Sequence, residues 1–188
     1  MGDITTLLQQ ARTGDALAFD RLFGALYPEL RRIAHARLDR GPRDTLQGTT
    51  MLVHECYLKF RQAERLTPAD HAHFLAYAAT VMRSIVVDAA RASHAARRGG
   101  DAVHQPLSDE IADQVADTAS DGAEQILEMQ EALSQLTELD PQLARLVEMR
   151  YFGGMKDAEI ATVLELNERT VRRHWEKARL LLASSLRR

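Results

Sequence analysis

Residues 157–182 read DAEIATVLELNERTVRRHWEKARLLL, a segment with the form of two helices separated by a short turn. Ile160, Ala161 and Leu164 recur at helical spacing, which predicts the inner face of a short first helix. Asn167 is a good N-cap residue, so a longer second helix is expected to begin directly after it. Two helices joined by about three residues, the second rich in arginine at its start, are typical of a helix-turn-helix.

The residues before this segment predict two further helices. The first runs from Glu124 to Leu136, with apolar residues on one face. Asp140 and Pro141 then form an N-cap followed by a proline at the first helical position, which predicts a second helix through Tyr151. A pair of glycines ends it.

The N-terminal half of the chain also has helical periodicity. Apolar residues recur at spacings of three and four between Leu7 and Leu26, and Asp15 stands where it would cap the second of two helices. Pro28 predicts either a new helix or a kink near it. Further helices are expected over Met51–Phe60 and, at greater length, over residues 72–98. No strand-like alternation of useful length and no internal repeat is found, so the expected fold class is all-α.

Charge divides the chain into three parts. Residues 1–100 carry 14 Lys and Arg against 10 Asp and Glu, residues 101–121 carry none against 6, and residues 122–188 carry 10 against 11. The middle part is acidic, contains a proline and lacks aromatic residues, so it buries too little apolar surface to offset the entropy of ordering it. We therefore expect a flexible acidic linker between two small helical domains.

The composition excludes several classes of protein. With 188 residues, 45% hydrophobic and 27% charged, the chain is typical of soluble globular proteins. The single cysteine, Cys56, excludes a disulfide framework, and no segment has the apolar length of a membrane helix or the form of a signal peptide. We expect a cytoplasmic protein with no membrane contact of its own. No motif for a nucleophile, a phosphate loop or a metal stands out, so neither catalysis nor a cofactor is expected.

The second helix of the segment 157–182 suggests DNA as a partner. The major groove of duplex DNA admits one helix, whose first turns meet the base edges. Val171, Trp175 and Ala178 are expected to face inward. The alternative is a solvated charged face, and the near-neutral charge of residues 122–188 argues against tight DNA binding by this part alone. The candidate contact residues on the outward faces are Glu168, Arg169, Arg172, Arg173 and Lys177.

Two segments resemble bacterial sigma factors. Residues 139–182, LDPQLARLVEMRYFGGMKDAEIATVLELNERTVRRHWEKARLLL, resemble sigma region 4. AFDRLFGALYPELRRIA and HFLAYAATVMRSIVVDAARASHAARRGG resemble sigma region 2. These two regions joined by a short acidic linker are the layout of extracytoplasmic-function (ECF) sigma factors. The resemblance implies a non-enzymatic subunit that binds the beta-prime clamp and beta flap of core RNA polymerase and directs it to promoter DNA.

The resemblance also implies roles for individual residues. Residues 1–100 would serve as region 2 and residues 122–188 as region 4, whose outward charged residues would read the −35 element. Phe74 and Tyr77 of the long helix could stack on an unpaired base, but burial in the bundle is the favoured interpretation. The implied −10 contacts lie on the same helix, at Arg83, Ser84, Asp88, Arg91, Arg97 and Arg98.

The chain departs from the family pattern at the helix that docks on the clamp. Most ECF proteins open this helix with an acidic cluster, whereas the aligned residues 48–55 read GTTMLVHE. The resemblance implies polymerase contacts at Thr50, Leu52, Val53 and Glu55, of which only Glu55 carries a negative charge. If the clamp presents arginines here, the unmodified protein should bind core polymerase poorly.

Thr49 and Thr50 indicate how the lost charge could be restored. Phosphorylation adds about −1.5 to −2 charges, and a helix N-terminus favours an anion. Residues 50–55 also resemble the branch of ECF factors controlled by a transmembrane serine/threonine kinase. The hypothesis is that phosphorylation of Thr50, with Thr49 as the lesser candidate, switches core binding on. The alternative is that a threonine merely caps the helix.

Glu165 is a second departure, because the family usually has glycine at this turn position. A residue with a side chain adopts the left-handed conformation only at some cost, so the turn is expected to differ slightly. The −35 preference is correspondingly not predicted.

Two other classes of protein compete with the sigma-factor interpretation. A stand-alone helix-turn-helix transcriptional regulator would bind promoter DNA without polymerase. A helical adaptor would have no DNA role and would tolerate charge reversal at Arg172 and Arg173.

Overall fold

The computed structural model describes residues 2–38, 45–62, 68–97 and 122–185. Within these ranges the chain forms eight helices and no strand, which confirms the all-α prediction. The expected linker, residues 101–121, and Arg98 lie outside the described residues. The helices are α1 (Gly2–Arg12), α2 (Ala16–Leu38), α3 (Thr45–Gln62), α4 (His71–Arg97), α6 (Gly122–Leu139), α7 (Pro141–Tyr151), α8 (Asp157–Leu164) and α9 (Glu168–Ser185).

Aspartate caps begin two helices, α2 and α4, of the N-terminal module, by which we mean α1 to α4. The Oδ1 atom of Asp15 accepts hydrogen bonds from the backbone N–H of Leu17 at 2.9 Å and of Ala18 at 3.1 Å, which confirms Asp15 as the cap of α2. Asp70 caps α4 in the same way, through the N–H of His73 at 2.9 Å. Pro28 lies inside α2, so no new helix begins there.

The helix α3 begins earlier than its apolar pattern predicts. It starts at Thr45 instead of Met51, so Thr49 and Thr50 lie within the helix. The interpretation of either threonine as its N-cap is therefore wrong. The apolar run that suggested the start does not mark the first helical residue, because the helix begins before that run.

The C-terminal module, α6 to α9, follows the local signals closely. Asp140 caps α7 by accepting from the N–H of Leu143 at 3.2 Å, with Pro141 at the first helical position. Asn167 caps α9 by accepting from the N–H of Thr170 at 2.8 Å. Between α8 and α9, Glu165 has φ 54° and ψ 41°, the left-handed conformation expected from its turn position.

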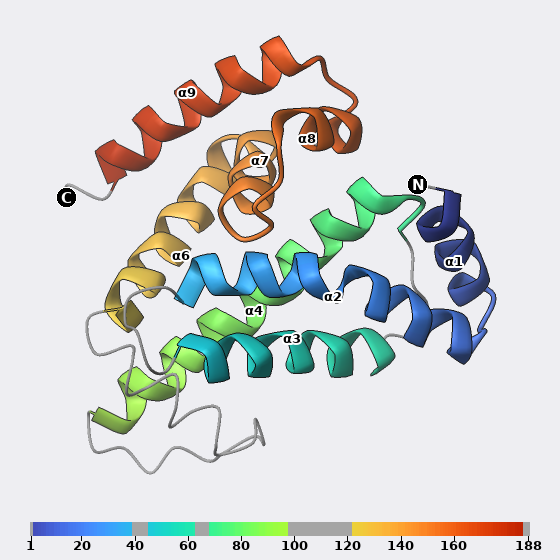
Figure 1. Ribbon diagram of the computed structural model, residues 1–188. Helices are drawn as coiled ribbons and strands as arrows, with labels where there is room; N and C mark the ends of the chain where they lie inside the picture. The colour runs from blue at the N-terminus through green and yellow to red at the C-terminus, as the bar shows by residue number, and fades with distance from the viewer. Residues whose placement is uncertain (1, 39–44, 63–67, 98–121, 186–188) are drawn as a thin grey trace.

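The two modules pack directly against each other. Figure 1 shows α4 passing between α3 and the helices α6, α7 and α8. One apolar cluster combines Leu26 and Met82 of the N-terminal module with Leu146 and Ile160 of the C-terminal module. A second places Ala79 of α4 among residues of α6, α7 and α9. The hydrophobic cores of the two expected domains are therefore continuous in this structure.

Candidate nucleic-acid and partner interfaces

The α8–turn–α9 unit presents one face of α9 to the outside. Ile160 and Val171 are completely buried where the two helices meet, and Ala178 is buried against α6 and α7. Trp175 is partly buried. The left-handed Glu165 reverses the chain within three residues, so the first turns of α9 project beyond α8 (Figure 1). This arrangement leaves the N-terminal half of α9 accessible to a large partner.

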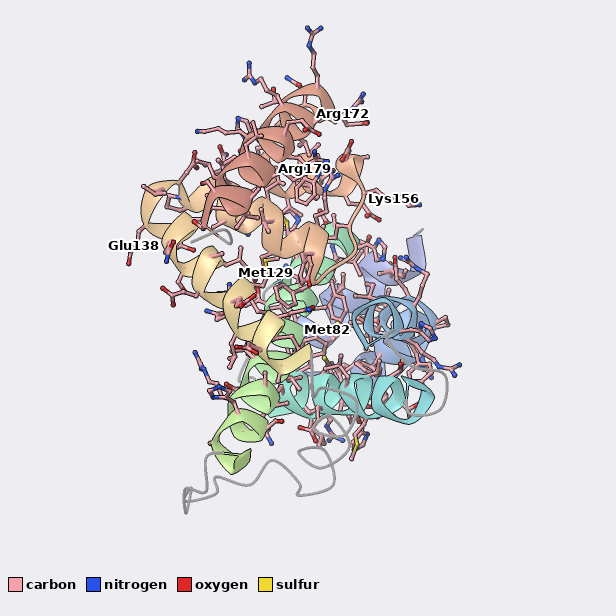
Figure 2. All side chains as sticks on the ribbon, turned by 90° about the vertical axis from the view of Figure 1, so that its left-hand side faces the viewer. Met82, Met129, Glu138, Lys156, Arg172 and Arg179 are labelled. Carbon is pink, nitrogen blue, oxygen red and sulfur yellow. The ribbon has the colours of Figure 1, made fainter. Side chains whose placement is uncertain are left out.

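The five outward residues of α9 expected from the sequence are all exposed: Glu168, Arg169, Arg172, Arg173 and Lys177. Three of them are held by neighbours. Arg172 pairs with Asp157 at 3.3 Å and with Glu168 at 3.4 Å, and Lys177 pairs with Asp140 at 3.1 Å. Figure 2 shows Arg172 near the outer end of α9, while Arg179 lies closer to the body of the molecule. Within the described part of the chain, Arg169 and Arg173 form no ion pair, so their guanidinium groups are open to a phosphate or a base edge.

Arg150 is a supporting residue that sequence reasoning missed. Its guanidinium pairs with Asp157 and lies 4.7 Å from the ring centroid of Trp175. Burial lowers the pKa of Arg150. Asp157 thus bridges Arg150 and Arg172, which ties the end of α7 to the start of α9. The sequence pattern does not indicate the contact between Arg150 and Trp175, because the turns before α8 and before α9 both lie between these two residues.

The candidate −10 residues on α4 separate into two groups. Ser84, Asp88 and Arg91 gather on one side with Lys59 of α3. The Nζ of Lys59 donates to Ser84 at 2.9 Å and lies 3.9 Å from Asp88, which also pairs with Arg91 at 3.6 Å. Lys59 was not among the expected site residues. This group remains half-exposed or exposed.

Arg83 points instead into the boundary with the C-terminal module. Its Nη1 donates to the carboxylate of Glu148 in α7, and its Nε donates to Gln130 of α6 at 2.9 Å. Arg97 ends α4, and its side chain, like all of Arg98, lies outside the described residues. The structure therefore brings Ser84, Asp88 and Arg91 together but directs Arg83 elsewhere.

The two aromatic residues of α4 belong to the bundle. Phe74 is completely buried and packs edge-on against Phe60, with ring centroids 5.4 Å apart. Tyr77 is partly buried and stacks on the same ring at 5.2 Å. The interpretation as a core residue is confirmed for Phe74. It is confirmed in part for Tyr77, which stacks on Phe60 but is only partly buried.

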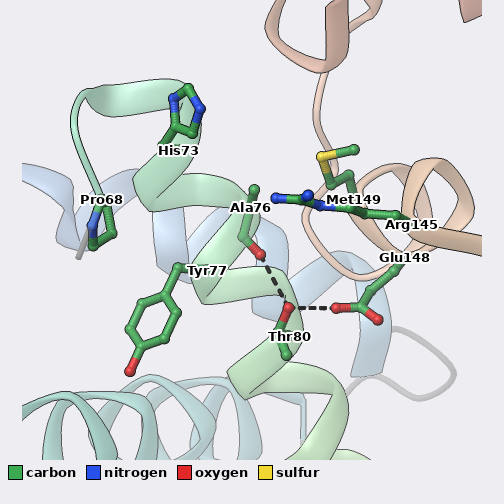
Figure 3. Close-up of a pocket in the computed structure, with 8 residues that line it drawn as sticks. All are labelled: Pro68, His73, Ala76, Tyr77, Thr80, Arg145, Glu148 and Met149. Atoms are coloured by element: carbon green, nitrogen blue, oxygen red, sulfur yellow. Dashed lines mark hydrogen bonds between the residues drawn. The ribbon is translucent and has the colours of Figure 1, made fainter. Parts of the chain in front are cut away.

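A cavity of about 230 Å³ lies between α4 and α7. Figure 3 shows His73, Tyr77 and Thr80 on one side and Arg145, Glu148 and Met149 on the other. The Thr80 hydroxyl lies within hydrogen-bonding distance of the Glu148 carboxylate and 3.3 Å from the carbonyl oxygen of Ala76. The walls of the cavity come from both modules, so the cavity exists only while the two modules are packed together.

The helix α3 divides the four expected polymerase residues between core and surface. Leu52 and Val53 are buried in the N-terminal module, whereas Thr50 is exposed and Glu55 is half-buried. Thr49 is completely buried. The exposed face of α3 continues from Thr50 to His54 and Leu58, at the four-residue spacing that places side chains one above another. Sequence reasoning missed His54 and Leu58, although this spacing could have indicated them.

The sequence as a whole matches a known family. The family model described as ECF sigma factor matches residues 1–188, the entire chain. The chain belongs to the ECF sigma factor family. No curated protein and no solved structure matches the sequence significantly.

Membership identifies this ECF sigma factor as a transcription initiation factor and not as an enzyme. Its partners as a sigma factor are core RNA polymerase and promoter DNA. None of the described helices combines the length and apolar character needed to cross a membrane. Across the same residues, no group of three His, Cys, Asp or Glu side chains could hold a metal ion.

Proposed function

We propose that this sigma factor binds core polymerase through the exposed face of α3 and that phosphorylation of Thr50 activates this binding. The observation that carries the proposal is the chemistry of α3. Its first turn contains no acidic residue, and Thr50 is the exposed member of the threonine pair. A negative charge at this face must therefore be added if the clamp surface is basic.

A phosphate on Thr50 would provide that charge. It adds about −1.5 to −2 charges and three strong acceptor oxygens, which suit arginine forks. Thr50 is the sixth residue of α3, beyond the first turn in which the helix dipole acts. The expected help from the dipole is therefore small, and contacts with cationic groups of the clamp account for the gain in affinity.

The neighbours of Thr50 define the extent of the proposed docking surface. His54 and Leu58 share its face, and Leu58 is one of the large apolar residues exposed in this structure. Glu55 lies beside them, half-buried. Leu52 and Val53 lie on the buried side of α3 and support this surface by packing α3 against the core of the N-terminal module. We assign direct polymerase contact to the exposed residues and a supporting role to the buried pair.

The proposed activator is a serine/threonine kinase, of the transmembrane class that the resemblance implies. A kinase must bind its target hydroxyl in an accessible segment. Thr50 satisfies this requirement in the folded protein, whereas Thr49, with no exposed surface, does not. We therefore propose Thr50 as the modified residue.

Promoter recognition is divided between the modules in this proposal. The first turns of α9 read the −35 element through Arg169, Arg172 and Arg173, with Glu168 and Lys177 at the edge of the contact. The α4 helix contacts the −10 element through Ser84, Asp88 and Arg91, with Arg83 joining once the modules separate. We also assign Arg97 and Arg98 to the −10 contact, as the resemblance implies. The residues 101–121 join the two modules.

In vitro transcription with purified core polymerase tests the activation proposal. We expect Thr50-phosphorylated protein to direct transcription and bind core at least tenfold more tightly than the unmodified protein. Thr50→Val should abolish the gain from kinase treatment, whereas Thr137→Val, at an exposed threonine of α6, should leave it intact. Equal core affinities for phosphorylated and unmodified protein would refute the activation mechanism. Promoter binding without polymerase would instead favour a stand-alone regulator.

A further inference from the structure

We propose that Asp157, the first residue of α8, orients the side chain of Arg172 so that this arginine reads a guanine in the −35 element. The assignment rests on the proposed −35 role of α9 and deepens it, because it names the base that is read and the residue that selects it. Asp157 is a positioning residue, since it acts on DNA only through Arg172.

The two oxygens of the Asp157 carboxylate have different partners. Oδ1 accepts a hydrogen bond from Nη2 of Arg150, whose guanidinium lies 4.7 Å from the ring centroid of Trp175. Oδ2 lies 3.3 Å from Nε of Arg172. The side chains of Arg150 and Asp157 are 25% and 26% exposed, whereas that of Arg172 is 64% exposed. The carboxylate therefore links a mostly buried arginine of α7 to an exposed arginine of α9.

Two carboxylates restrain the guanidinium of Arg172. Its Nε faces Asp157, and its Nη2 donates to Glu168 at 3.4 Å. Each Nη of a guanidinium carries two N–H groups, and the outer pair, one on each Nη, forms a parallel fork. Among the described residues, no hydrogen bond or ion pair engages Nη1 of Arg172. The outer fork is therefore left for DNA, near the outer end of α9 (Figure 2).

The restrained charge of Arg172 favours a base edge over a phosphate. The two neighbouring carboxylates offset its positive charge and repel the anionic DNA backbone, whereas the acceptor atoms of a base carry no net charge. Guanine presents two acceptors, O6 and N7, in the major groove, while adenine places an amino donor beside its N7. A guanidinium that is already held also loses less side-chain entropy on binding. Arg172 is therefore suited to guanine.

Sequence selection by the holoenzyme tests the role of Asp157. Thr50-phosphorylated protein is assembled with core polymerase and offered promoter duplexes randomised over the −35 region. Sequencing of the bound DNA gives the base preference at each position. We expect the wild type to prefer guanine over the other bases by about fivefold or more at one position, as a good bidentate contact allows.

Two variants should lose this preference at the same position. Asp157→Asn removes the charge that orients Arg172, and Arg172→Lys keeps the positive charge but removes the fork. We expect both to reduce the guanine preference to about twofold or less, with the other positions unchanged. The matched control is Glu176→Gln, which removes a carboxylate that pairs with exposed Arg179 at 3.7 Å further along α9. This control should keep the wild-type preference.

The lysine variant also separates positioning from folding. Asp157→Asn weakens the contact with Arg150 as well, and a damaged fold would lower binding to every sequence by the same factor. Arg172→Lys leaves the pair of Asp157 and Arg150 intact, because Arg172 lies on the exposed side of the carboxylate. A loss confined to one base pair in both variants therefore reports the pair of Asp157 and Arg172.

The remaining outcomes identify what fails. Asp157→Asn protein that keeps the guanine preference, or that binds all sequences more weakly by one factor, would overturn the positioning role. A position that depends on Arg172 but selects a base other than guanine would overturn the base assignment. A wild-type holoenzyme that selects no sequence over the −35 region would overturn the proposed role of α9 together with that of Asp157.

Discussion

Thr49 and Thr50 are consecutive residues of α3, but Thr49 has no exposed surface whereas Thr50 lies in contact with solvent. A helix turns by about 100° per residue, so neighbours on the border of the buried face can lie on opposite sides of that border. The difference decides which hydroxyl an enzyme can reach without unfolding α3.

Kinase treatment is therefore expected to modify Thr50 and not Thr49. Thr49→Val keeps nearly the same volume and should still be phosphorylated at the wild-type rate, whereas Thr50→Val should lose at least nine-tenths of the incorporated phosphate. Phosphopeptide mass spectrometry of both variants measures this directly. Phosphate found on Thr49 in folded protein would mean that α3 opens before modification.

Charge reversal on α9 should weaken −35 recognition according to position along the helix. Arg169→Glu or Arg173→Glu is expected to reduce holoenzyme binding to a −35 duplex by about 1–3 kcal/mol, the value of a good bidentate contact. Arg179→Glu removes the same charge later on α9, where Arg179 pairs with Glu176, and should have little effect. Fluorescence anisotropy at two salt concentrations measures the affinities. Equal losses at all three positions would indicate a general electrostatic effect instead of a recognition surface.

The ionised carboxylate of Asp140 should stabilise the folded protein at neutral pH, and this stabilisation should be lost at strongly acidic pH. Burial raises the pKa of Asp140, but the hydrogen bond from the backbone N–H of Leu143 and the ammonium of Lys177 together lower it by more. The net shift is therefore downward. A carboxyl with a lowered pKa contributes its full stabilisation above the unfolded-state value of about 3.9 and loses it as the pH falls through the folded-state pKa. Asp140→Ala should cost about 1 kcal/mol at pH ~7, typical of an N-cap, and clearly less below pH ~3.

Urea unfolding at both pH values measures the contribution of Asp140. Glu138→Gln is the control, because Glu138 is exposed on the adjacent helix end. An Asp140→Ala cost that does not change with pH would assign the stabilisation to packing instead of charge.

Cys56 should react with thiol reagents only when the protein unfolds. Burial raises its pKa to about 12, so the reactive thiolate is scarce at neutral pH, and the side chain has no exposed surface. We expect reaction with an aromatic disulfide reagent at pH ~8 to be at least 100-fold slower than for free cysteine, and to accelerate through the urea transition. Fast labelling of the native protein would show that α3 opens locally.

Local hydrogen bonding explains why the positions of several helices could be predicted from the sequence. Asp15, Asp140 and Asn167 each accept from a backbone N–H two or three residues ahead, so their capping roles depend only on nearby sequence. The exposed charges of α9 follow from the same periodicity that buries Val171. The start of α3 differs from the prediction, because an apolar pattern does not mark the first helical hydrogen bond.

The amino-acid sequence by itself determined the all-helical class, the main caps, the charged face of α9 and membership of the ECF sigma factor family. Only the tertiary structure decided that Thr49 is buried beside exposed Thr50, and that Arg83 meets Glu148, 65 positions further along the chain. Apolar periodicity and capping depend on residues within one or two turns of a helix, so the sequence alone predicts them. The packing of α4 against α7 depends on the shapes of two assembled surfaces, which exist only after the chain has folded.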